Sequence, residues 1–472
     1  MRRLLLLVLA AGLGVAAFAL PRPPEQEGPT FTGPGVADES AAAQGSVWYC
    51  PWVNAGAERD SWLMLAAEPA VTAEVTLPSP IPNEEPDRAV FEYPSHTAEP
   101  VEVASIVRRG DAPAFVEFDT GPAATSAIVT ADTADGSTLV AGDRCTGSVP
   151  KLWHLPGGTT REGRRSTLRL FNPFPEPAKA TVAGTSEFGD VGLVALSSVD
   201  VPGRSWLDVD LNVIVPLLDQ LSLTISTDEG LVIPSLVVAS AIDEATWPAT
   251  GLSTTWEFPG VRQTGLVPRL YVSNPGDVEV EVEIDVYGRR GSAPASRSVA
   301  VPARTPAIIR LGDLIGGEFG VRIRATGPIA AVVVSEDLSR GSGEEAGDEE
   351  GEEASEDPQP SGADRIAGTV GTHTPARRWL LPGPGAVPTA ASAVWIMNAH
   401  TEPVTVTLQP LGLVELPAEK VALPAERTER IVLPQESGTF GYLIDASQPI
   451  SAAWSVESGD GVAFIAGVAI DE

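Results

Sequence analysis

Short runs of alternating apolar and polar residues are the main pattern in this chain. The clearest is residues 278–286, where aliphatic side chains alternate with Glu and Asp, so the aliphatics face one way and the carboxylates the other. Residues 71–77 and 404–408 repeat the alternation with Thr or Glu at the polar positions. These segments are predicted to be half-buried β-strands, and the strand at 278–286 is predicted to have a solvated acidic face.

A second pattern is a short β-like run that ends in Asn and is followed by a polar turn. It occurs four times, at residues 48–54, 168–172, 270–274 and 394–398. The Asn side chain suits such a turn because it can form hydrogen bonds with nearby backbone groups. The four runs therefore indicate an internal repeat.

Two further landmarks keep step with the Asn runs in the last three repeats. A Trp-x-x-Pro-Gly segment precedes the Asn, with its indole at Trp153, Trp256 and Trp379. A later strand contains Val-Pro or Leu-Pro, with its proline at Pro202, Pro302 and Pro424. Because the Trp recurs at one position of each repeat, we expect it to pack at the edge or core of a module.

These patterns predict an all-β chain of tandem immunoglobulin-like β-sandwich modules, because each repeat has room for six or seven short strands separated by turn signals. The predicted modules are residues 46–149, 150–254, 255–338 and 377–472. The first is the most diverged, and within it residues 78–100 are predicted to be a Pro- and acid-rich insertion.

Arg2 and Arg3 follow Met1, and residues 4–20 carry no charge. This pattern predicts that residues 1–20 are a signal peptide or a single N-terminal membrane anchor. Residues 21–45 are rich in Pro, Gly and acid and poor in aliphatics, so they are predicted to be a disordered spacer. The body is therefore predicted to be extracytoplasmic, either membrane-anchored or secreted.

Net charge excludes one class of partner. The formal charge is −32, and such a surface repels phosphate backbones, so we expect no nucleic acid partner. Nine acids lie within residues 344–357 without a base. Residues 339–376 are therefore predicted to be an acidic disordered insertion, in preference to a calcium loop, because the spacing of calcium ligands is missing.

The sequence offers little support for catalysis. Its four histidines, His96, His154, His373 and His400, lack metal-ligand spacing, and His154 is predicted to lie in a surface loop or turn. Neither a nucleophile elbow nor a phosphate-binding or dinucleotide-binding glycine motif occurs. We therefore predict no catalytic, cofactor-binding or metal-binding residues, no cofactor and no enzyme activity.

Two cysteines, Cys50 and Cys145, are present and neither belongs to a metal-ligand pair. In an exported protein we expect them to form a disulfide; the alternative is two buried free thiols. Trp52 and Trp62 lack counterparts in the other repeats, so they are the candidate binding aromatics, since an indole face can stack on a sugar ring.

The residues Trp48-Tyr49-Cys50-Pro51, Arg144-Cys145 and the recurring Leu-x-Leu-x-Asn-Pro resemble an actinobacterial family of secreted or single-pass membrane-anchored β-rich proteins of unknown function. The resemblance implies export and a β-rich body that serves the cell envelope. Asn54 and Asn398 depart from the pattern because Ala follows each of them.

The leading hypothesis is a non-enzymatic scaffold or adhesion-type protein of the cell envelope, with an envelope protein as partner. The alternative is a protein that binds a cell-wall glycan through Trp52 or Trp62. A third hypothesis, a wall-polymer hydrolase, requires two carboxylates that converge in a cleft.

Overall fold

The computed structural model describes residues 47–470 except 55–58, 82–83, 108–110, 133–137, 264, 338–364, 384–389, 413–415, 434–437 and 459–460. For residues 54, 111, 294 and 295 it describes the backbone only. The predicted export segment, the spacer and most of the predicted acidic insertion lie outside the described residues.

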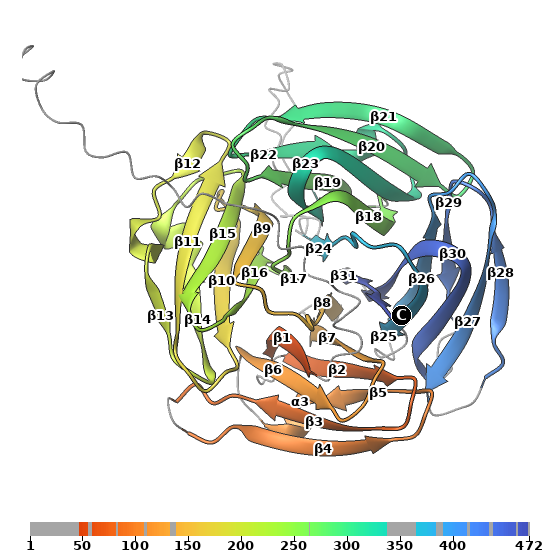
Figure 1. Ribbon diagram of the computed structural model, residues 1–472, viewed down its shortest axis with the longest axis horizontal. Coiled ribbons are helices and arrows are strands. Elements are labelled where there is room, and N and C mark those ends of the chain that lie inside the picture. The colour runs from red at the N-terminus through yellow and green to blue at the C-terminus, as the bar shows by residue number, and fades with distance from the viewer. Residues whose placement is uncertain are drawn as a thin grey trace, which may run out of the picture. The chain divides into compact units, whose positions relative to one another are not determined.

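The first module contains two antiparallel sheets (Figure 1). Its elements are β1 (Val47–Asn54), β2 (Arg59–Ala67), β3 (Val71–Leu77), β4 (Asp87–Tyr93), β5 (Thr97–Glu102), α3 (Val103–Ile106), β6 (Asp111–Phe118), β7 (Ala123–Asp132) and β8 (Thr138–Arg144). The strand orders are β1-β6-β3-β4 in one sheet and β5-β2-β7-β8 in the other.

The second module repeats this plan with sheets β9-β15-β11-β12 and β14-β10-β16-β17, and β13 also pairs with β11. Its elements are β9 (Leu152–Gly158), β10 (Arg165–Asn172), β11 (Ala178–Ser186), β12 (Gly189–Val191), η1 (Val194–Leu196), β13 (Val199–Val201), β14 (Ser205–Asp210), α4 (Leu211–Ile214), β15 (Leu221–Glu229), β16 (Ile233–Ala239) and β17 (Glu244–Pro248).

In the third module one long strand, β23, belongs to both sheets. The elements are β18 (Ser253–Arg262), β19 (Val267–Asn274), β20 (Val280–Gly288), β21 (Ser292–Val301), β22 (Thr305–Arg310), η2 (Leu311–Asp313), β23 (Glu318–Glu336) and β24 (Ile366–Val370). The first half of β23 pairs with β18 and β20, and the second half pairs with β19 and β24.

The fourth module has the same arrangement around its long strand β30. The elements are β25 (Ala376–Pro382), β26 (Ala391–Asn398), β27 (Val404–Gly412), β28 (Glu419–Leu423), β29 (Arg427–Val432), β30 (Thr439–Ser458), β31 (Gly461–Ala466) and β32 (Val468–Ala469). β30 pairs with β25 and β27 in one sheet and with β26 and β31 in the other.

The prediction of an all-β chain built from tandem β-sandwich modules is confirmed, because the apolar positions of each alternating segment face a shared core between two sheets. In β20, for example, Val282 and Ile284 are fully buried. The prediction of a solvated acidic face on this strand is wrong at one position. Asp285 is 0% exposed, because the neighbouring fourth module contributes to its surroundings.

The repeated Trp is a core residue in all three predicted positions. Each indole is buried, and its Nε1 donates a 3.0 Å hydrogen bond to a backbone carbonyl: Trp153 to Val232, Trp256 to Ile329, and Trp379 to Ile450. The three acceptors are equivalent, because each directly precedes the strand segment that pairs with β10, β19 or β26. The expectation that these indoles pack within their modules is confirmed.

The Asn turns also behave as expected in the last three modules. The side-chain amide donates to the backbone carbonyl four residues later, in Asn172, Asn274 and Asn398. The same side chain accepts a 3.0 Å hydrogen bond from the backbone N–H two residues later. Each Asn thus fixes the turn that leads out of β10, β19 or β26.

The alignment of the first module on Asn54 is wrong. Strand β1, which ends at Asn54, pairs with β6 as β9 pairs with β15 and β18 with β23, so Trp48 occupies the position of the repeated Trp. The strand that corresponds to the Asn runs is β2. This strand ends in Ala instead of Asn. The turn after it is nevertheless equivalent, because the backbone N–H of His96 donates to the Glu68 carbonyl as that of Arg204 donates to the Phe174 carbonyl.

Two predicted insertions contain strands. Within residues 78–100, β4 and β5 provide the edge strands of the two sheets, so the prediction of an insertion there is wrong. Within residues 339–376, Ile366–Val370 forms β24 and pairs with β23, so that part of the insertion prediction is wrong as well. In both cases short strands border Pro-rich or acid-rich stretches, and the composition of those stretches obscured them.

One strand from each module contacts the corresponding strand of the next. β8 contacts β17, β17 contacts β24, β24 contacts β31, and β31 contacts β8. Gly461 lies so close to the backbone of Val140 that an added Cβ would be 2.3 Å from its nitrogen. The four modules therefore contact one another in a closed cycle, and the fourth packs on the first.

Candidate functional site

The residue after each repeated Trp lies between its own module and the next. Because side chains alternate along a strand, a Trp that faces the core places its neighbour on the outer face of the sheet. These neighbours are Tyr49, His154, Glu257 and Leu380. Four equivalent positions thus carry four different chemistries.

Between the first and second modules this position opens into a cavity of about 260 Å³. Tyr49 of β1 and Phe115 of β6 are paired across neighbouring strands and share one face of the sheet, with ring centroids 6.3 Å apart. Phe174, from the turn after β10, reaches over from the second module and lies 6.0 Å from Tyr49. Pro78, Pro86, Pro173 and Pro175 complete the apolar lining. We call this cavity the Tyr49–Phe174 hollow.

Polar groups line the same hollow. Arg88 and Arg204 contribute guanidinium groups, Glu117 a carboxylate, and Thr76 a hydroxyl. Thr76 is 1% exposed, and its Oγ1 has no hydrogen-bond partner among the described residues. Burial, and secondarily the Glu117 carboxylate, raises the pKa of Tyr49, so its hydroxyl stays protonated. The hollow therefore combines aromatic surface with hydrogen-bonding groups and two cations.

The internal repeat shows what is unusual about Arg204. Its counterpart in the third module, Arg304, has the same left-handed backbone conformation and is paired with Asp277 through two hydrogen bonds, of 2.9 and 2.7 Å. The residue that corresponds to Asp277 in the second module is Pro175. No ion pair joins Arg204 to a described residue, and its side chain is exposed at the hollow.

Between the third and fourth modules the equivalent position is occupied by a buried charge network. Glu257 is 3% exposed and accepts a hydrogen bond from the Ser451 hydroxyl of the fourth module. Asp285 accepts from Arg322 at 3.1 Å, and Arg324 lies 3.1 Å from it. Burial raises the pKa of Glu257. These two carboxylates are buried and do not line the Tyr49–Phe174 hollow.

Between the second and third modules the position is His154. It is 3% exposed in β9, so the prediction of a surface loop is wrong. Its Nδ1 lies 3.2 Å from the Thr224 hydroxyl, and burial lowers its pKa to about 4. The error arose because His154 stands on the outer face of its sheet and is covered by another module. Leu380, at the fourth position, belongs to an apolar cluster with first-module residues.

Ion pairs connect consecutive modules. Arg59 of β2 pairs with Glu244 of β17, and Arg262 of β18 pairs with Glu457 of β30. Glu336, which is 1% exposed at the end of β23, pairs with Arg161, Arg164 and Arg269. Its carboxylate lies 2.7 Å from Arg161 and 3.1 Å from Arg164, both of the second module.

A smaller cavity, of about 110 Å³, also lies between the first and second modules. Asp243 lines it, and its carboxylate accepts hydrogen bonds from the backbone N–H groups of Glu244 and Ile366, at 2.8 and 2.9 Å. Burial is the main cause that raises the pKa of Asp243 to about 7. The bond to Ile366 connects the second module to β24.

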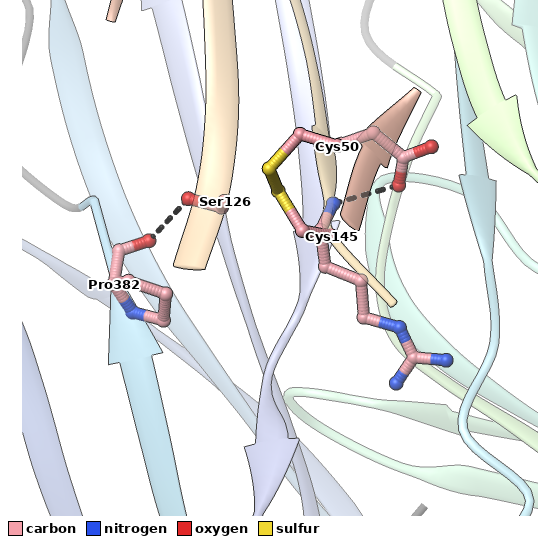
Figure 2. The surroundings of a disulfide bond; sticks show 6 residues. Cys50, Ser126, Cys145 and Pro382 are labelled. Carbon is pink, nitrogen blue, oxygen red and sulfur yellow. Dashed lines mark hydrogen bonds between the residues drawn. A yellow bond between two sulfur atoms is a disulfide. The ribbon is translucent and has the colours of Figure 1, made fainter. Parts of the chain in front are cut away.

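The structure pairs Cys50 with Cys145, so the predicted disulfide is confirmed. Cys50 lies in β1 and Cys145 follows β8, and the bond therefore links the two sheets of the first module. Figure 2 shows the disulfide and, in the same region, the Ser126 hydroxyl directed at the Pro382 carbonyl of the fourth module.

The two candidate binding aromatics are placed differently. Trp52 is 5% exposed and packs against Val129 and Val237, so a sugar ring has no open indole face there. Trp62 is half-buried against the core of the fourth module. The structure does not bring them together at either cavity, and binding by either stays a prediction. Tyr49, Phe115, Phe174 and Arg204 line the larger cavity and were not recognised in the sequence.

Within the part of the chain that the structure describes, no group of three or more His, Cys, Asp and Glu residues could hold a metal ion. Among the same residues, no helix is both long and apolar enough to cross a membrane.

Fold and interfaces define a multi-module all-β protein whose modules are joined by ion pairs. The chain belongs to a family of unknown function, DUF5719, whose model matches residues 103–354. No curated protein sequence matches this chain.

Two solved structures have low similarity to it. One is the α-L-rhamnosidase of Streptomyces avermitilis complexed with L-rhamnose, at 10% identity and a TM-score of 0.13 over 84% of this chain and 54% of that chain. The other is a glycoside hydrolase family 32 protein of Bifidobacterium adolescentis, at 8% identity and a TM-score of 0.15 over 89% of this chain and 99% of that chain. With TM-scores this low, neither similarity bears on function.

Proposed function

We propose that this chain is a non-enzymatic scaffold of the cell envelope that holds an extracytoplasmic partner protein on a fixed array of modules. The observation that carries the proposal is the set of inter-module ion pairs, above all that of Glu336 with Arg161 and Arg164. A buried carboxylate that pairs with guanidinium groups of another module favours one relative placement of the two modules. Any other placement would separate these buried charges from one another. Modules fixed in this way suit a protein that presents surfaces.

The second module offers a surface for a partner. Phe188 and Val194 are 84% and 82% exposed, and Val213 and Leu217 are exposed as well. All four belong to the second module, and we infer that they are candidate contacts for another protein. The disulfide fits an oxidising compartment, as expected outside the cytoplasm.

Photo-cross-linking in living cells tests the proposal. A photoreactive residue replaces Phe188 or, as a matched control on another module, the exposed Glu419. We expect Phe188 to give a defined adduct with an envelope protein and Glu419 to give none. Cross-links to cytoplasmic proteins only, free thiols at both cysteines, or cleavage of wall polymer by the purified chain would contradict the proposal.

A further inference from the structure

The Tyr49–Phe174 hollow has the size and lining of a site for one small ring. Its volume of about 260 Å³ lies just below the range of ~300–1,000 Å³ that is typical of small-ligand pockets. Tyr49, Phe115 and Phe174 supply aromatic surface from two modules. Since the ion pairs hold the modules together, the hollow is formed before any ligand arrives.

The charges at the hollow favour an anion. The chain as a whole carries a net charge of −32, yet two arginines and one acid line this cavity. Arg88 is already bonded to Glu74 at 2.9 Å, whereas Arg204 has no ion pair with a described residue. In the third module an Asp neutralises the equivalent Arg304, and in the second module Pro175 replaces that Asp. The substitution leaves one guanidinium available for a ligand carboxylate.

The remaining polar groups favour hydroxyls on the same ligand. The buried Thr76 Oγ1 lacks a partner among the described residues, and leaving it unpaired is unfavourable. The Glu117 carboxylate is exposed at the rim and can accept a hydrogen bond from a hydroxyl. A ring with apolar faces, hydroxyl groups and a carboxylate satisfies all of these groups together.

We propose that the Tyr49–Phe174 hollow binds a uronic acid unit of an acidic glycan. The sugar ring packs against the aromatic side chains, its carboxylate pairs with Arg204, and its hydroxyls bond to Thr76 and Glu117. A proline-rich peptide is the competing occupant of an aromatic cavity, but it brings neither the hydroxyls nor the carboxylate. The proposal is independent of the scaffold role, because it concerns a different surface from Phe188 and Val194.

Titration calorimetry of the purified full chain with a glucuronic acid oligosaccharide tests the proposal. We expect saturable binding to glucuronate and none to the matched neutral glucose oligosaccharide. Arg204→Gln should weaken binding about tenfold or more, since a hydrogen bond between charged groups contributes ~1.5–3 kcal/mol. Thr76→Val and Phe174→Ala should weaken it as well.

The internal repeat provides the control. Arg304→Gln removes the equivalent arginine of the third module, which is paired with Asp277, and should leave the affinity unchanged. Circular dichroism and thermal unfolding confirm that each variant is folded. Absence of glucuronate binding, equal binding of the neutral sugar, an unchanged affinity in Arg204→Gln, or preferential binding of a polyproline peptide would each overturn the proposal.

Discussion

The Ser126 hydroxyl in β7 donates a 2.8 Å hydrogen bond to the backbone carbonyl of Pro382 in β25, 256 residues further along the chain. Pro382 belongs to the repeated Trp-x-x-Pro-Gly segment of the fourth module. Arg378 of the same strand pairs with Glu68 of the first module at 2.8 Å. The last module is thereby bonded to the first, and the cycle of contacts is closed by specific polar groups.

Ser126→Ala should destabilise this closure. Ser126 is fully buried, so the substitution removes the donor from a buried carbonyl without giving it access to water. We expect the free energy of unfolding to fall by about 1–3 kcal/mol in a denaturant titration. Ser105→Ala is the control, because Ser105 bonds to a backbone carbonyl at an exposed site. Equal losses in the two variants would show that the contact between the modules adds nothing.

Glu336→Gln should be more damaging, because it removes the buried carboxylate that Arg161 and Arg164 share. Removing one member of a buried ion pair costs ~3–5 kcal/mol, and chemical denaturation of the full chain measures the loss. Asp277→Asn breaks the exposed pair with Arg304 and should leave stability almost unchanged. If Glu336→Gln proved as mild as this control, the ion pairs would not fix the modules.

The sequence predicts the strands of this fold better than it predicts the contacts between modules. Alternation predicted that Asp285 lies on the outer face of a sheet, but it did not predict that another module covers that face. His154, which was predicted to lie in a surface loop or turn, is on a covered sheet face as well. The sequence alignment of the first module is wrong because Asn54 also ends a short β-like run. The strand that corresponds to the Asn runs, β2, ends without Asn. One sequence difference points to the Tyr49–Phe174 hollow: Pro175 of the second module occupies the position that Asp277 has in the third.

Trp256→Phe tests the repeated indole. The change leaves the Ile329 carbonyl without its donor and creates a small cavity in the core of the third module. We expect a loss of about 2 kcal/mol or more in the free energy of unfolding, and the same for the equivalent Trp153 and Trp379. Trp206→Phe is the control, since that indole is half-buried. Substitutions that are equally harmless at Trp256 and Trp206 would contradict a structural role.

Asp243 should make stability depend on pH. Burial is the largest cause of its raised pKa of about 7; the Glu244 carboxylate adds to it, whereas Arg365 and the backbone hydrogen bonds from Ile366 and Glu244 oppose it. An Asp in the unfolded chain has a pKa of ~3.9. Between these two values the folded protein binds a proton that the unfolded chain has released, so stability falls as pH rises from about 4 to 7.

Asp243→Asn removes this titration, so we expect a smaller loss of stability across that window than in the unmodified chain. Denaturant titrations at pH 4.5, 6 and 7.5 (about one and a half units apart, to span the window between the two pKa values) measure the difference. Asp219→Asn, at an exposed position, should keep the slope of the unmodified chain. An identical pH dependence in Asp243→Asn would show that the carboxyl titrates as it does in the unfolded chain.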